Sequence, residues 1–322
     1  MKRLLLGLTT ISIVLAVGLT AGSAWAGYKM EIDEFKWISL GMGARFEAGA
    51  TEKDTGNAWE KNFNVDSVRP YISGQVHEYI KFEVNLDFQT GTDLDTYLRL
   101  LDGIVKFEFN DQVNIWGGRF LPPTDRANFS GPYFLNTWAF PLVAQKYPQI
   151  FDGRDNGVAF WGYDPSGRLK YQAGVFEGNS DAKSPSFDAR LTLNLLDKET
   201  GYYNASTYFG EKDILALGLV INAQPDGSGR DATGKRRSFV GWNADLLFEK
   251  KFGSAGALMI DAAYYGYHND AFKGAPATDA IPCTDVMGVL TPDPCPVAAM
   301  PAVTSPRPDG DSFFVTAGWY LP

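Results

Sequence analysis

The sequence predicts an all-β protein, a transmembrane antiparallel β-barrel that follows an N-terminal signal peptide. Apolar and polar side chains alternate strictly from residue 80 to 89, so a strand there has one oily and one polar face. A tilted strand of about ten residues can cross a bilayer core. No apolar run after the first 26 residues approaches the roughly 18 residues that a spanning helix needs. The 34 glycines, 8 Trp, 15 Tyr and 22 Phe fit short strands and tight turns.

The N-terminus has the pattern of a secretory signal. Lys2 and Arg3 precede an apolar stretch from residue 4 to 17, and Ala24-Trp25-Ala26 supplies a small-x-small cleavage site. We therefore expect residues 1–26 to be removed and residues 27–322 to be exported to the bacterial outer membrane. The chain has a net charge of −9, which does not indicate the basic surface that binding to nucleic acid requires.

Two-residue periodicity predicts about twelve strands. They fall near residues 35–49, 63–76, 79–90, 99–109, 112–120, 152–163, 168–178, 186–196, 213–223, 237–249, 256–267 and 312–320. A water-soluble sandwich and a membrane barrel share this periodicity, because only the direction of the apolar face differs between them.

The connections between these strands favour the barrel. Every second one is short, as at 77–78, 110–111, 164–167 and 253–255, and the turn at 197–212 is the exception. The alternate set is longer: 50–62, 91–98, 121–151, 224–236 and 268–311. Outer-membrane barrels have such brief periplasmic turns and long external loops.

A long connection rich in aromatic residues runs from residue 121 to 151. It carries five prolines and seven Phe, Tyr or Trp residues, and this aromatic content argues against disorder. We expect it to fold into the barrel mouth and narrow the channel. The alternative is an external loop packed on its neighbours or on a second subunit.

Four segments carry a resemblance to a known family. They are Gly118-Arg119-Phe120-Leu121-Pro122-Pro123, Asn128-Phe129-Ser130-Gly131-Pro132-Tyr133, Asp152-Gly153-Arg154-Asp155-Asn156-Gly157-Val158 and Leu169-Lys170-Tyr171-Gln172-Ala173-Gly174-Val175-Phe176. Together they resemble the phosphate-selective porin O and P family of bacterial outer membranes. The resemblance implies a sixteen-stranded homotrimer whose third external loop constricts the pore. Since such porins continue beyond the position of Pro322 and end on an aromatic residue, we expect a C-terminally truncated barrel.

Charged residues on the polar faces are the candidate pore chemistry. Fixed cations in a narrow passage concentrate anions, whereas opposed rows of charge give mild selectivity. The alternative is that these residues pair across strands and hold the wall together. The candidate cations are Arg45, Arg69, Lys81, Arg119, Arg126, Arg154, Lys170 and Arg190, and the counter-charges are Glu47, Glu83, Asp87 and Asp188, with Asp102, Asp245 and Asp261.

Cysteine and histidine usage bears on the remaining chemistry. Cys283 and Cys295 lie close together in the segment 268–311, and we expect a disulfide in an exported chain, with two free thiols as the alternative. His268 is too far from them for a metal site. With His77 as the other histidine, no catalytic constellation forms, so we expect neither an enzyme nor a cofactor.

The sequence therefore predicts passive diffusion of small hydrophilic solutes or ions, leaning towards anions, through a lumen narrowed by the 121–151 loop. Outer-membrane lipid and lipopolysaccharide are the expected surroundings, the latter contacted by the basic cluster Arg230, Lys235, Arg236 and Arg237, for which a solvated loop is the alternative. The alternative function is a structural barrel that sheathes or anchors a partner, such as a redox protein.

Overall fold

The computed structural model describes most of the chain after the expected signal peptide. The described residues are 27–52, 59–90, 96–137, 139–179, 182–228, 235–269 and 310–321. The signal peptide 1–26, both cysteines and nearly all of the segment 268–311 lie outside them.

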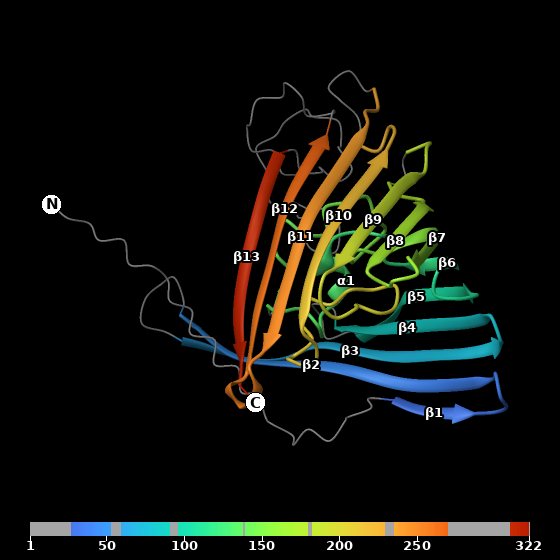
Figure 1. Ribbon diagram of the computed structural model, residues 1–322. Coiled ribbons are helices and arrows are strands. Elements are labelled where there is room, and N and C mark those ends of the chain that lie inside the picture. The colour runs from blue at the N-terminus through green and yellow to red at the C-terminus, as the bar shows by residue number, and fades with distance from the viewer. Residues whose placement is uncertain are drawn as a thin grey trace. The chain divides into compact units, whose positions relative to one another are not determined.

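Thirteen strands of the described residues form one antiparallel sheet in sequence order (Figure 1). They are β1 Gly27–Glu31, β2 Trp37–Glu52, β3 Trp59–His77, β4 Ile80–Thr90, β5 Thr96–Glu108, β6 Asn114–Phe120, β7 Asp155–Tyr163, β8 Leu169–Phe176, β9 Ser186–Asn194, β10 Ile214–Gln224, β11 Phe239–Lys251, β12 Ala257–Asn269 and β13 Gly310–Tyr320. The all-β antiparallel class and the twelve predicted strands are confirmed, and β1 is an additional strand. One short α-helix, α1 Arg126–Ser130, and one 3-10 turn, η1 Gly253–Ala255, accompany them. No helix in the described ranges has the length and apolarity to cross a membrane.

The chain divides into two compact units. The first comprises residues 1–78 and 82–101, and the second comprises residues 79–81 and 102–322. In the first unit, β2 pairs with β1 and β3, with a bulge between Arg45 and Phe46. Leu40, Met42 and Phe46 of β2 are exposed, while the alternate positions are half-buried. The predicted alternation of β2 is thus present in the structure.

The two faces of the sheet in the second unit have the reverse of a soluble protein's polarity. On β9, Arg190, Thr192 and Asn194 are buried, whereas Leu191 and Leu193 between them are exposed. On β10, Leu217, Leu219 and Ile221 form an exposed apolar row. A water-soluble sandwich buries its oily rows, so the polar face is the inner one here.

The connections keep the expected short and long classes with one change. Short turns join β3 to β4, β5 to β6, β7 to β8 and β11 to β12. The expected loop 50–62 is mostly strand, because β2 extends to Glu52 and β3 begins at Trp59. The exception at 197–212 is confirmed as the long segment between β9 and β10, called here the inward turn (residues 195–213).

The exposed apolar row of β10 gives a direct test of what that face meets. Leu219 is 61% exposed near the middle of the strand. We predict that Leu219→Arg lowers the free energy of unfolding by about 2–4 kcal/mol in phospholipid vesicles, because a cation on a lipid-facing strand centre is poorly solvated. Urea unfolding of the protein in vesicles measures this, with Leu219→Phe as the matched control. A change within about 0.5 kcal/mol for the arginine variant, as on a water-exposed surface, would contradict a lipid-facing position.

Candidate functional site: a polar sheet face covered by two folded segments

The long loop (residues 121–154) lies against the polar face of the second unit. Its helix α1 begins after Asp125, whose Oδ2 caps it by accepting a hydrogen bond from the backbone N–H of Asn128 at 3.1 Å. All five residues of α1 are buried. Gly153, near the loop's end, has a φ of 79° and lies so close to the Asn128 amide that a Cβ there would overlap it. The loop is therefore packed at α1 and near its end, and it folds onto this polar face.

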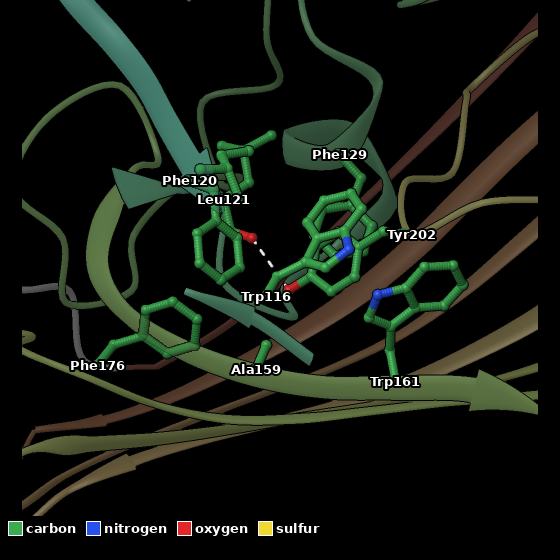
Figure 2. Close-up of a cluster of buried hydrophobic side chains, with 9 residues drawn as sticks. Trp116, Phe120, Leu121, Phe129, Ala159, Trp161, Phe176 and Tyr202 are labelled. Atoms are coloured by element: carbon green, nitrogen blue, oxygen red, sulfur yellow. Dashed lines mark hydrogen bonds between the residues drawn. The ribbon is translucent and has the colours of Figure 1, made fainter. Parts of the chain in front are cut away.

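An aromatic cluster holds the start of the long loop (Figure 2). Trp116 stacks on Tyr202 with ring centroids 4.6 Å apart, and Phe129 of α1 lies 5.5 Å from Tyr202. The Tyr202 hydroxyl donates to the carbonyl of Leu121 at 3.2 Å. Tyr202 belongs to the inward turn, so this cluster joins the loop to the turn.

A second apolar cluster holds the later part of the loop. Leu135, Ala144 and Tyr147 pack with Tyr265 and Tyr267 of β12 and with further buried residues of β10 and β11. Tyr147 and Tyr267 meet edge to face, with centroids 5.5 Å apart. The Tyr267 hydroxyl also donates to the Val143 carbonyl at 2.8 Å. This part of the loop is thereby fixed to the inner face.

The inward turn is held by polar residues of the strands. The Lys170 ammonium on β8 donates to the carbonyls of Gly201, Tyr202 and Tyr203 at 3.2 to 3.4 Å. Glu249 on β11 accepts from the backbone N–H groups of Tyr208 at 2.8 Å and Gly210 at 2.5 Å. These strand side chains meet backbone groups that would otherwise be buried without partners.

A buried chain of alternating charges links loop, turn and wall. Arg126 of α1 makes a bidentate pair with Glu199 of the inward turn at 2.5 and 2.8 Å. Its Nε also donates to Asp245 of β11 at 3.3 Å. Arg190 of β9 makes the other bidentate pair of this chain, donating to Asp245 at 2.6 and 2.8 Å. Arg190 also donates to the Thr124 carbonyl at 3.1 Å.

The pKa of Glu199, the carboxylate of the inward turn, reflects its pairing with Arg126. Burial alone would raise the pKa of Glu199, but the Arg126 guanidinium and its hydrogen bonds outweigh burial and hold the pKa below its ordinary value. Glu199 thus stays ionised, and Arg126 stays charged beside it because Glu199 and Asp245 raise its pKa. The loop and the turn are held together by two full charges in a site without solvent exposure.

Gly218 makes room for the Arg190–Asp245 pair. It lies on β10 between β9 and β11, opposite Thr192 on one side and Asp245 on the other. A Cβ at this position would overlap the guanidinium of Arg190 and the carboxylate of Asp245. The pair therefore spans a strand only because that strand has no side chain there.

The remaining predicted site residues of the second unit are also engaged. Arg154 contacts Asp102 at 3.2 Å, Lys81 contacts Glu108 at 2.7 Å, and Asp188 accepts from Asn222. Arg119 donates to Asn156 at 3.0 Å and lies over the Phe151 ring. Of the eight candidate cations, Arg126 and Arg154 belong to the long loop, while Arg119, Arg190 and Lys170 contact the loop or the turn. Lys81 pairs with Glu108, and Arg45 and Arg69 belong to the first unit.

The first unit contains the other candidates. Arg69 and Arg99 share Asp87 at 3.1 and 3.5 Å, and Glu83 accepts from Asn85 at 2.7 Å. Arg45 is half-buried on β2. The side chain of Glu47 lies outside the described residues.

The sequence analysis missed the residues that build the inward turn. Glu199, Tyr202 and Glu249 were not among the candidates, although the segment that contains Glu199 and Tyr202 was the exception among the short turns. The available signal was that this long segment contains Glu199 and two adjacent tyrosines, Tyr202 and Tyr203. Asp125 was missed as well, and its place before α1 follows the preference for Asp at a helix N-cap.

Comparison with known proteins places the chain only distantly. No protein-family model matches it, and no curated protein sequence matches it. Among solved structures it is similar to a loop L8 deletion mutant of OmpT, an outer membrane protein of Vibrio cholerae. The TM-score is 0.39 and the identity 12%, over 76% of this chain and 83% of that chain. The resemblance to the phosphate-selective porin O and P family therefore stays a prediction.

The Arg126–Glu199 pair gives a second prediction. Arg126→Met leaves a buried carboxylate without its cation and should lower the free energy of unfolding by about 3–5 kcal/mol. Adding Glu199→Met should restore much of that loss, because the uncompensated charge is then gone. Urea unfolding measures both. Lys36→Met, at an exposed pair with Asp33, is the control and should change it by less than about 1 kcal/mol. Additive losses in the double variant would contradict the buried pair.

Gly218 gives a third prediction. Gly218→Ala should lower the free energy of unfolding by about 1–3 kcal/mol, because the added methyl group displaces the Arg190 guanidinium from Asp245. The matched control is Gly117→Ala on β6, whose Cβ would meet its nearest neighbour, Val158, at an ordinary 3.8 Å. Equal effects of the two substitutions in the same unfolding experiment would contradict the spacing role of Gly218.

Proposed function

We propose that the chain forms the wall of an outer-membrane β-barrel channel for the passive diffusion of small hydrophilic solutes or ions. The long loop and the inward turn narrow its lumen. One observation carries this proposal: the polar face of the sheet is the covered one and the apolar face is exposed, as a bilayer requires. In this proposal residues 27–322 belong to one barrel.

Two features of the inner face support an aqueous lumen. It carries Asn, Gln, Thr and charged side chains in alternate positions of β8 to β12, which suit water and polar solutes. Both side-chain polar atoms of Asn194 and of Asn204 are buried without a protein partner within the described part of the chain. Polar groups of this kind are normally satisfied by water.

The charge arrangement supports weak selectivity. Arg126, Arg154 and Arg190 are each paired with a carboxylate, so much of their field is cancelled within the wall. The lean towards anions then rests on the family resemblance and on Arg119, which contacts an amide and an aromatic ring. Trimer assembly rests on that resemblance alone, and contact with lipopolysaccharide rests on the basic residues of the connection 224–236.

The covered inner face favours a channel over a sheath. The polar strands of the second unit are already occupied by the chain's own loop and turn, through Arg126, Lys170 and Glu249. A sheath needs that face for its partner. The proposal also requires no covalent chemistry.

Recordings in planar bilayers test the proposal. The purified protein should show discrete conductance steps, and replacing residues 125–147 by a short Gly-Ser linker should enlarge them, because this removes α1 and most of the long loop. Glu199→Gln is combined with the deletion so that no turn carboxylate loses its arginine.

The matched control shortens a different connection, residues 226–236, and should leave the conductance unchanged. A folded wild-type protein without conductance would remove the channel function. Equal conductance with and without residues 125–147 would remove the constricting role of the loop. Loss of a co-purified partner in the deletion variant, without any conductance, would favour the sheath.

A further inference from the structure

Two buried carboxylates lie where the long loop meets β12. Asp125 precedes α1, is fully buried, and accepts from the Tyr265 hydroxyl of β12 at 3.0 Å. Asp261 on β12 is 1% exposed and accepts from the Asn136 amide of the loop at 3.0 Å. One oxygen of each, Oδ1, has no hydrogen-bond partner among the described residues.

These two differ in their charge partners from Glu199 and Asp245, the carboxylates of the buried chain of charges. Glu199 and Asp245 each form ion pairs with arginine, as described above. Within the described ranges, neither Asp125 nor Asp261 has an ion pair with Lys or Arg. A buried carboxylate with only neutral donors is costly to ionise, whereas its protonated form is not.

Among the described residues, the arginines that face these two carboxylates are already paired with other carboxylates. From β12, Tyr265 and Tyr267 face Asp125, and Tyr147 faces it from the loop. From β11 and β9, Asp245 and Arg190 face it, but Arg190 is engaged with Asp245. Asp261 is faced by Arg126 and Asp245, which are likewise engaged, and by the Ser206 hydroxyl of the inward turn.

We propose that Asp125 and Asp261 form a proton-operated latch at this contact, so that acidification holds the long loop more tightly against β12 and narrows the channel. The narrowing of the channel rests on the proposed channel function. The docking of the long loop against β12 does not depend on that function. Protonation removes the charge of each carboxylate.

The direction follows from Asp125. Burial raises its pKa to about 6, against the lowering effects of the Asn128 N–H and the Tyr265 hydroxyl. An undocked loop would expose this carboxyl to water, where its pKa returns to about 3.9. The docked state is therefore favoured at low pH, and this preference is lost as the pH rises through about 6. Between pH 7.5 and pH 5, Asp125 alone shifts the docking equilibrium about tenfold towards the docked loop.

Hydrogen exchange of the peptide containing residues 121–137 tests the docking step. After correction for the intrinsic pH dependence of exchange, protection of these amides should rise about tenfold from pH 7.5 to pH 5. The variant carrying Asp125→Asn and Asp261→Asn should show the acid level of protection at both pH values. Asparagine is a good N-cap, so α1 keeps its cap in this variant.

The matched control is Asp164→Asn in the exposed turn between β7 and β8. Hydrogen bonds from Ser166 and the N–H of Leu169 lower the pKa of Asp164 to about 2, so it stays ionised at both pH values, and its variant should respond as the wild type does. Protection that does not change with pH in the wild type, or that still changes in the doubly substituted protein, would overturn the latch.

Single-channel recordings at the same two pH values separate the latch from the channel proposal. The wild type should spend about tenfold less time in wider substates at pH 5, and the doubly substituted protein should show this behaviour at both pH values. Conductance without this pH dependence removes the latch and leaves the channel. Absence of conductance together with pH-dependent protection removes the channel and leaves the docking step.

Discussion

The structure depends on one constraint: the polar inner face of β7 to β12 must find partners where it is covered. Oily residues such as Leu191 and Leu219 occupy the exposed face, so charged and amide side chains are turned inward. The long loop and the inward turn supply carbonyls, N–H groups and counter-charges to them, as Lys170 and Glu249 illustrate. The same two segments therefore cover the inner face and provide hydrogen-bond partners for its polar side chains.

The ion pairs show how strand register and loop conformation act together. Arg190 on β9 reaches Asp245 on β11 only across the bare backbone of Gly218. Asp245 then holds Arg126 of the loop, and Arg126 holds Glu199 of the turn. Because each member compensates the next, loop, turn and wall form a single electrostatic unit whose individual bonds are not independent.

The sequence predicted the strands well because their signal is local. Alternation in segments such as residues 186–196 reports directly on two faces, and the long loop was found by its length and aromatic content. Strand β1, with five residues, is too short to show this periodicity clearly. The inward fold of the turn could not be found, since it depends on pairs such as Arg126 with Glu199, 73 positions apart. For the same reason Arg126 and Arg190 were predicted to face the lumen without their partners being identified.

In the proposed channel, the position of Lys170 has a consequence for permeating ions. Three backbone carbonyl oxygens, from Gly201, Tyr202 and Tyr203, converge on its Nζ. Rings of carbonyls are how cation channels replace the hydration shell of a passing ion. Here the Lys170 ammonium already occupies the position between these oxygens. A sodium or potassium ion would have to displace it in order to bind there. The turn can thus bring a cluster of oxygen dipoles together beside β8 without creating a cation site in the proposed channel.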